Sequence, residues 1–404
     1  MKSKRFSLRT RLANKLRHHV LPPLFRIAAP LLWVKRRLRP YRANFEMLSG
    51  KISGGEDSIQ VYCGIQDQIR HHVLKLIFGT PPEGKPSGEQ KIYQVFRGIR
   101  KLAPSADIAL APATEGQHAW MDDGTWFSIP EWLNGYVRIP LPESVRRSTS
   151  LKSVARILRQ QDYGYIATRD EKLFEEFYFR MHEPYIKKIY GDGACLDSFA
   201  EKRAATEDFD LLLLYKKSAP GEYLAGLLVI HEPQVPRLWA FGVRDGDRQL
   251  VRNGALSALY LFSFEFLAAA GHRDVFMGGS RPFLRDGVLN AKRRYAQRIT
   301  AARWQGFGLK ILKLTPAVKT FLLENPFIFR SHGKIYGAIF LETPPDAGRV
   351  AELHHQFYCE GLERLVIWVF DQGSSPAPAL PPELAARTEF RSADGLVSDH
   401  LHLP

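Results

Sequence analysis

The chain has 404 residues, 45% of them hydrophobic, and its 57 lysines and arginines exceed its 42 aspartates and glutamates to give a formal net charge of +15 at pH 7. The hydrophobic content excludes a chain that is disordered throughout. The length exceeds that of a usual single domain, so we expect an α/β protein of two lobes with an arm and a tail.

The positive charge is concentrated in a basic N-terminal arm, predicted over residues 1–50. Residues 1–45 contain thirteen cations and no acid, and without them 44 basic residues face 42 acidic ones. The apolar segment 20–34 is too short and too interrupted to span a bilayer, and no signal-peptide cleavage site follows it. The cations that flank Leu, Phe and Trp suit an interfacial helix of residues 1–45 on an anionic membrane surface. A disordered tail, a helix packed on the body and contact with RNA are the alternatives.

A first lobe is expected over residues 51–150. Short apolar runs predict strands at 59–62 and 106–111, and longer runs predict helices at 71–78 and 91–101.

A second lobe is expected over residues 151–370, followed by an unordered tail over 371–404 that is rich in proline, alanine and serine. Tyr178, Met181 and Tyr185 recur at helical spacing and predict a core-facing stripe. The predicted order is a helix at about 170–190, strands at 211–215, 223–230 and 237–243, a buried helix at 250–270, a strand from residue 274, a glycine pair and a basic helix.

The most informative segment is 274–295, where a strand leads into a glycine pair, a polar loop and a basic helix. Such a junction gathers backbone N–H groups, a hydroxyl and cations around one point, an arrangement that holds an anion or a developing oxyanion. The predicted substrate-binding residues are Gly278, Gly279, Ser280, Arg281, Arg293 and Tyr295. The predicted catalytic residues are Lys292, Asp286 and Glu183.

Several of these residues have an alternative structural role. The glycines can serve only to turn the chain, Ser280 and Asp286 can cap a helix, and Tyr295 can lie in the core. If Gly279 has a positive φ, a β-branched replacement should damage both fold and activity.

The charged candidates also leave alternatives open. Lys292, Arg293 and Arg294 share one helical turn and cannot all face a site, and a solvated face is their alternative role. Arg281 and Lys292 are expected in a polar, solvated segment. His182 and Glu183 lie next to a proline, where a helix kinks, and either could accept the proton that an amine nucleophile loses.

The element order resembles the acyltransferase fold of the GNAT superfamily, and the local motifs resemble its two-lobed FemAB-like branch. The motifs are the turn Gly278-Gly279-Ser280, the dipeptide Asp286-Gly287, the basic helix that contains Lys292 and Tyr295, and the helices of residues 151–185. The resemblance implies two GNAT-like lobes, each with a mixed sheet flanked by helices, and a first lobe that closes with the aromatic segment 126–132, which contains a proline. It also implies that Lys292 lies close to the substrate.

A donor site is expected where the third strand of the second lobe leads into the buried helix. GNAT acetyltransferases hold the pyrophosphate of acyl-CoA there with an Arg/Gln-x-x-Gly-x-Gly/Ala turn, of which this chain has no clean copy. Its nearest segment keeps cations and a glycine, and a helix N-terminus with nearby cations can hold phosphate. The predicted donor-binding residues are Arg244, Arg248, Arg252, Asn253 and Gly254.

No metal site is expected. Cys63, Cys195 and Cys359 are far apart, which indicates a reducing cytoplasm rather than a disulfide framework or a zinc site. The absence of H-E-x-x-H, G-x-S-x-G and P-loop motifs disfavours a metalloprotease, a serine hydrolase and a P-loop kinase.

The combined interpretation is a cytoplasmic acyltransferase, peripheral on the inner face of the membrane if the arm binds there. Its donor would be acyl-CoA, an acyl carrier protein or aminoacyl-tRNA, and its acceptor an amine or hydroxyl of a cell-envelope or polysaccharide-related molecule. Such chemistry depends on positioning and oxyanion stabilisation, so the lack of a catalytic triad does not argue against an enzyme. The alternative is a non-catalytic GNAT-fold binding or scaffold protein of an envelope or exopolysaccharide machine.

Overall fold

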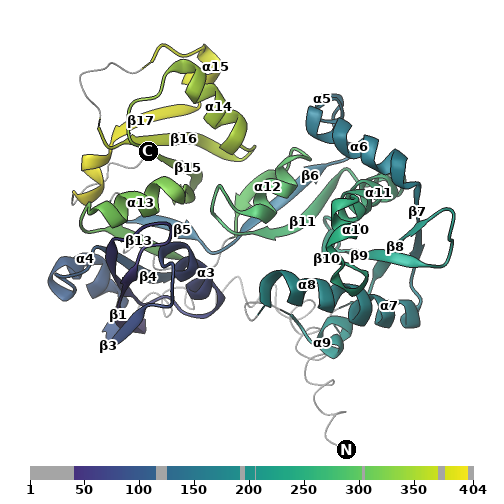
Figure 1. The fold of residues 1–404 in the computed structure, drawn as a ribbon, viewed down its shortest axis with the longest axis horizontal. Coiled ribbons are helices and arrows are strands. Elements are labelled where there is room, and N and C mark those ends of the chain that lie inside the picture. The colour runs from purple at the N-terminus through teal and green to yellow at the C-terminus, as the bar shows by residue number, and fades with distance from the viewer. Residues whose placement is uncertain are drawn as a thin grey trace, which may run out of the picture.

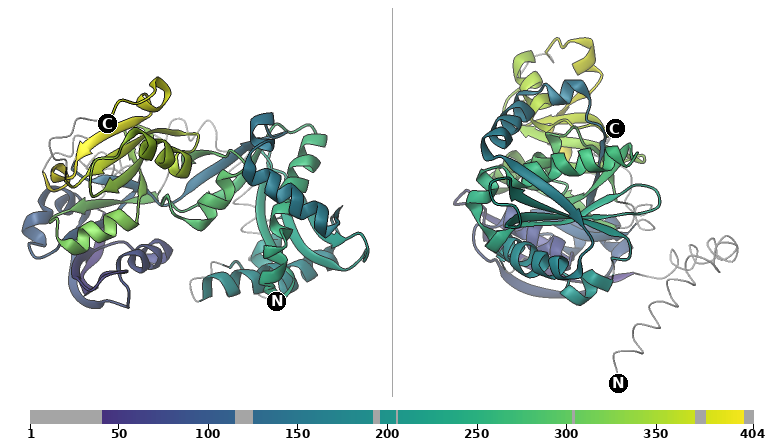
Figure 2. Two further views of the ribbon diagram at one scale, coloured as in Figure 1. Left: turned by 45° about the horizontal axis from the view of Figure 1, so that its top comes forward. Right: turned by 90° about the vertical axis from the view of Figure 1, so that its right-hand side faces the viewer.

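The computed structural model describes residues 41–114, 125–191, 196–204, 206–302, 305–371 and 378–398. These residues form two large mixed sheets flanked by helices, which confirms the predicted α/β class with two lobes. The lobes lie side by side, with α12 (Gly287–Arg293) between them (Figures 1 and 2).

The sheet of the first lobe has ten described strands. In pairing order they are β17 (Thr388–Ser392), β16 (Leu362–Val369), β15 (Lys334–Leu341), β14 (Phe327–Ser331), β5 (Phe127–Pro130), β13 (Gln305–Ile311), β4 (Ile108–Thr114), β2 (Ser58–Cys63), β1 (Arg42–Lys51) and β3 (Glu83–Lys91). The helices of this lobe are α3 (Asp67–Ile77), α4 (Ile92–Leu102), α13 (Pro316–Glu324), α14 (Ala347–Phe357) and α15 (Pro382–Ala385). Its core contains a group of aromatic rings, in which Phe127 packs edge to face against Phe327, Phe329 and Trp368.

The sheet of the second lobe has seven described strands. In pairing order they are β12 (Arg298–Ala301), β6 (Leu133–Arg138), β11 (Asp274–Ser280), β10 (Arg237–Val243), β9 (Tyr223–Ile230), β8 (Phe209–Lys216) and β7 (Tyr163–Thr168). Its helices are α5 (Glu143–Arg146), α6 (Thr149–Gln161), α7 (Glu171–Phe177), the π-helix η3 (Tyr178–His182), α8 (Glu183–Tyr190), α9 (Phe199–Ala204), α10 (Arg248–Arg252) and α11 (Ala255–Ala269). The predicted order of helix, three strands, helix, strand and helix is confirmed.

The two faces of the second sheet carry separate cores. Leu212 and Leu214 of β8 pack in a cluster with residues of α11, whereas Leu211 and Leu213 pack in a cluster with residues of α7 and η3. Because successive side chains of a strand point to opposite faces, these clusters define an α11 face and an η3 face. The predicted stripe is buried, but Met181 belongs to the η3 face and Tyr185 to the α11 face.

The chain passes between the lobes twice. β6 directly follows β5 but pairs in the second sheet, and β13 follows β12 but pairs with β4 and β5 in the first sheet. We expected the second lobe to run over residues 151–370, whereas the described strands from β13 onward lie in the first sheet. Pairing between segments this far apart in the chain leaves no local pattern in the sequence.

Both predicted tails contribute strands. Residues 42–50 of the expected arm lie in β1, which pairs with β2 and β3, and residues 1–40 lie outside the described residues. The described part of the expected tail, residues 378–398, is not unordered, because β17 pairs in parallel with β16, and Ala393 and Leu396 are fully buried. β17 is an edge strand, and its hydrogen bonds come from the neighbouring strand β16. The proline-rich composition of the surrounding segment therefore gave no sign of this strand. None of the described helices is long and apolar enough to cross a membrane.

Candidate active site

The second sheet opens between β10 and β11. These parallel strands share a single ladder pair, Arg237 with Phe276, whereas β10 pairs with β9 along its length. Two residues of β10 oppose one of β9 between Leu238 and Ala240, and this bulge leaves Trp239 outside the ladder. Beyond the single pair, the described residues of β10 and β11 form no further ladder, so the facing edges of the two strands do not bond to each other.

The glycine pair forms a second bulge, where the register of β11 against β6 shifts between Phe276 and Gly279. Gly278 has a φ of +77°, which glycine adopts readily, whereas Gly279 has no positive φ. We expected a β-branched residue at Gly279 to be strained by a positive φ. The positive φ is at Gly278, so that strain is expected there instead. A Cβ at Gly279 would instead lie 3.0 Å from the ring of Trp132, so this position is restricted by packing.

The polar loop after the bulge joins the two lobes. Phe283 is buried in the core of the first lobe and forms an isolated bridge with Phe327 of β14. The Leu284 N–H donates to the carbonyl of Pro326 at 2.8 Å. The loop is thus held by the first lobe and is not the solvated segment that the sequence suggested.

Arg281 is also less exposed than expected. Its guanidinium lies over the ring of Trp132, 3.8 Å from the centroid, and pairs with Glu131 at 3.6 Å. The side chain is 11% exposed. These contacts hold Arg281 against the segment between β5 and β6.

Lys292 is buried, with 4% of its surface exposed. Its Nζ donates to the carbonyl of Gly279 at 2.8 Å, and a Cβ on Gly278 would lie 3.8 Å from the same atom. Burial lowers the pKa of Lys292 to about 8, and the nearby carboxylate of Asp286 opposes that effect. The ammonium therefore supports the bulge of β11.

Asp286 has the capping role that the sequence left open. Its Oδ1 accepts a hydrogen bond from the Leu289 N–H at 2.8 Å at the start of α12. Burial raises the pKa of the carboxyl, and the backbone hydrogen bonds of Leu289 and Val288 oppose this. Ser280 does not cap α12; it is 2% exposed, and its hydroxyl has no partner among the described residues.

The other two candidates on this segment have structural contacts. Tyr295 is buried and packs against Tyr260 and Phe264 of α11. Arg293 donates to the carbonyl of His355 at 2.8 Å, at the end of α14 in the first lobe. The structure thus places Tyr295 in the core and uses Arg293 to join the lobes.

Glu183 lies on a different element from the other predicted catalytic residues. It is on α8, where its carboxylate pairs with Lys187 at 2.7 Å one turn further along the helix. Among the described residues, the hydrogen bond and ion pair of Glu183 are with Lys187 and not with α12. Lys292 and Asp286 therefore form one group and Glu183 lies apart from it.

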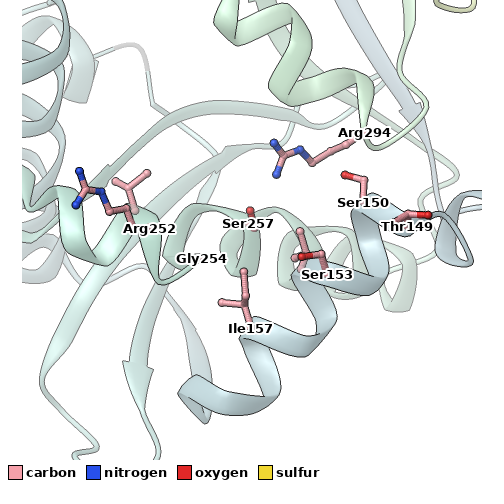
Figure 3. A pocket seen from close by; sticks show the side chains of 10 residues that line it. Thr149, Ser150, Ser153, Ile157, Arg252, Gly254, Ser257 and Arg294 are labelled. Carbon is pink, nitrogen blue, oxygen red and sulfur yellow. The ribbon is translucent and has the colours of Figure 1, made fainter. Parts of the chain in front are cut away.

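A pocket of about 400 Å³ opens at the start of α11 (Figure 3). Ser150 and Ser153 of α6 line one side, and Arg294 points toward Ser257 from the other. Gly254, with a φ of +81°, caps the helix, and the first N–H groups of a helix have no partner within it. Free N–H groups, hydroxyls and cations together favour an anionic ligand.

The pocket contains part of the predicted donor site. Arg252 and Gly254 line it, with Arg252 at the end away from Arg294 (Figure 3). Arg244 instead donates to the carbonyl of Tyr223 at 2.6 Å and pairs with Glu176 at 2.6 Å.

Two other predicted donor residues do not line this pocket. Arg248 is exposed on α10, and the side chain of Asn253 accepts a hydrogen bond from Gln249 at 3.0 Å. Sequence reasoning assigned no role to Ser150, Ser153 or Ser257. The serine and threonine run at the start of α6, with Ser150 and Ser153 three residues apart on one helix face, was the available signal.

Among solved structures, the chain is similar to L-PGS from Bacillus licheniformis, with a TM-score of 0.33 and 12% identity, covering 68% of this chain and 87% of that one. It is similar to FemX, with a TM-score of 0.34 and 11% identity, covering 65% and 83%. A third similar structure is a GCN5-related N-acetyltransferase from Kribbella flavida, with a TM-score of 0.25 and 10% identity, covering 74% and 67%. No protein-family model and no curated protein matches the chain.

All three TM-scores lie below 0.5, so the chemistry must be argued from this chain's own residues. Those residues provide two parallel strands that share a single ladder pair, and a pocket at the start of α11 that suits an anion. Within the described ranges, no group of three His, Cys, Asp or Glu side chains could hold a metal ion.

Proposed function

We propose that this protein is an acyltransferase of the GNAT superfamily, related to its FemAB-like branch, that transfers an acyl or aminoacyl group from an activated donor to an amine or hydroxyl. Two observations carry the proposal: β10 and β11 share only a single ladder pair, and an anion-favouring pocket lies at the start of α11. The motif resemblance at Gly278-Gly279-Ser280 and Asp286-Gly287 falls at the same junction.

The pocket suits the phosphate-bearing part of a donor. Acyl-CoA, an acyl carrier protein with its phosphopantetheine arm and aminoacyl-tRNA all carry phosphate, and charge-assisted hydrogen bonds from Arg252 and Arg294 would hold it. The donor carbonyl would then lie in the opening. There the bulge leaves the backbone of Trp239 outside the ladder, so that its N–H can stabilise an oxyanion.

The donor pocket gives a direct prediction. Arg294→Gln and Arg252→Glu are each expected to weaken CoA binding about ten- to a hundredfold, because each removes a charge-assisted hydrogen bond worth about 1.5–3 kcal/mol. The melting temperature should stay within a few degrees, since both are surface charge changes. Arg248→Gln is the matched control, because Arg248 is exposed nearby without lining the pocket. Isothermal titration with CoA measures the affinities, and equal affinity in all variants would place the donor elsewhere.

The acceptor is proposed to be a cell-envelope or polysaccharide-related molecule, reached at the cytoplasmic face of a membrane to which the basic arm binds. Deleting residues 1–40 leaves β1 intact and is expected to abolish binding to vesicles that contain anionic lipid. Neutral vesicles and high salt serve as controls, because the attraction is electrostatic. Sedimentation with vesicles measures it, and equal binding by both proteins would exclude the arm as the membrane contact.

The alternative function, a non-catalytic GNAT-fold scaffold, is favoured by one observation. Arg281 and Lys292, the cations expected at the active site, instead contact Trp132 and the bulge of β11. Incubation with acyl-CoA, acyl carrier protein and aminoacyl-tRNA pools, together with a pool of envelope precursors, separates the two functions. Acyl release that depends on the acceptor pool supports the enzyme, and no release from any donor leaves the scaffold.

A further inference from the structure

The π-helix η3 places His182 against the end of β10. Its Nδ1 lies 2.9 Å from the carbonyl of Phe241, so the ring donates from Nδ1 and presents Nε2 as an acceptor. A Cβ on Gly242 would lie 2.3 Å from the Met181 carbonyl and 2.6 Å from the Cα of His182, so glycine permits this close approach. π-helical turns are frequent at functional sites because they place one residue out of the regular helix register.

The position of His182 follows from the two faces of the second sheet. Met181 packs on the η3 face and Tyr185 on the α11 face, so the chain passes from one face to the other between them. Phe241 and Gly242 lie beyond the single pair of β10 with β11, in the part of β10 that has no ladder with β11. Through Phe241 and Gly242, His182 therefore contacts the part of β10 that has no ladder with β11.

The surroundings of His182 keep the imidazole neutral and fixed. The rings of Phe177 and Tyr178 flank it at centroid distances of 5.8 and 5.9 Å. Burial lowers the pKa of His182 to about 4, and the hydrogen bond that Nδ1 donates to the Phe241 carbonyl opposes that effect.

The charged groups that act on this imidazole are Lys202 of α9, Asp197 before that helix and Glu183 of α8. Nε2 has no hydrogen-bond partner among the described residues. Of the two proton acceptors that the sequence left open, Glu183 is paired with Lys187, and His182 retains a free lone pair.

We propose that His182 Nε2 accepts the proton of the acceptor amine as that amine attacks the donor carbonyl in the opening between β10 and β11. A bond forms between the amine nitrogen and the carbonyl carbon, and the bond from that carbon to the leaving sulfur or oxygen breaks. The neutral amine gives its proton to Nε2, and the protonated imidazole then passes that proton to the leaving thiolate or alkoxide, which returns His182 to its neutral form. This assignment rests on the proposed acyltransferase function, and it names the residue that would deprotonate the acceptor at the same site.

The decisive variant is His182→Asn. An asparagine amide can still donate to the Phe241 carbonyl, but it offers no base at the position of Nε2. We expect kcat for acyl transfer, in the donor and acceptor pools that the wild type uses, to fall about 10²- to 10⁴-fold. CoA affinity and the melting temperature should remain near wild type. Arg180→Gln is the control variant on the same π-helix and should keep its rate, because Arg180 is exposed and pairs with Asp245 at 3.0 Å.

A second variant separates a chemical role from a structural one. Added imidazoles should restore transfer by His182→Ala, and the restored rate should rise with the pKa of the added base, which filling a cavity would not produce. If wild-type protein transfers acyl groups and His182→Asn stays within threefold of it, the role of His182 is overturned and the acyltransferase stands. If wild-type protein transfers none, the acyltransferase and this assignment fall together.

Discussion

Replacing Phe283 by alanine is expected to destabilise the protein by about 3–5 kcal/mol, the usual cost of removing a buried phenylalanine ring. Phe283 is 4% exposed and packs in the core of the first lobe. In the chain it follows β11, a strand of the second sheet. Its ring lies 5.3 Å from that of His72 on α3, and its backbone bridges Phe327. The substitution therefore removes a contact that holds the junction loop between the lobes.

Arg285→Ala is the matched control for Phe283. Arg285 lies two residues further along the same loop and pairs with Glu324 at 2.6 Å, with 47% of its side chain exposed. An exposed ion pair contributes about 1 kcal/mol or less. Denaturant unfolding of both variants measures the difference. A cost below about 1 kcal/mol for Phe283→Ala would mean that this loop does not join the lobes.

Lys292→Met is expected to remove a rise in stability with pH that the wild type shows. Burial lowers the folded-state pKa of Lys292 from 10.5 to about 8. Below pH 8 both folded and unfolded lysine are protonated, and the folded state carries the full cost of the buried charge. Between pH 8 and 10.5 only the unfolded lysine binds the proton, so the free energy of unfolding rises with pH.

The size of that rise follows from the two pKa values. Their difference corresponds to about 3 kcal/mol, the largest change we expect between pH 7 and 10.5 for this group. Between pH 7 and 10.5 the free energy of unfolding of the wild type should rise by this amount relative to that of Lys292→Met. Arg294→Met changes a nearby exposed side chain, and its free energy of unfolding should change with pH as that of the wild type does. Unfolding curves at a series of pH values measure the gain. Parallel curves for wild type and Lys292→Met would show that Lys292 is solvated.

Much of the second lobe could be predicted from local pattern. Apolar runs of strand length bounded by turn residues located β8, β9 and β10, and the run of strong helix formers located α11. Its start was misplaced because Gly254, with a positive φ, separates α10 from α11. A glycine within an apolar run leaves that break undecided until the backbone is known.

The pairing of distant segments could not be predicted. β6 directly follows a strand of the first sheet in the chain but pairs in the second sheet. β17 follows a segment rich in proline, alanine and serine but pairs in the first sheet. A strand gains its hydrogen bonds from its neighbours, and those neighbours were more than a hundred residues away for β6 and β11. Local propensity contains no information about such partners.

The sequence by itself determined the α/β class, the junction at the glycine pair, and the capping of α12 as one of two roles for Asp286. Periodicity, turn residues and capping residues act over a few positions, so they can be read along the chain. The tertiary structure alone decided that Lys292 is buried under the bulge, that Arg294 and the serines of α6 meet at a pocket, and that His182 faces β10. Burial and charge environment depend on every element packed around a residue, and only the folded chain brings those elements together.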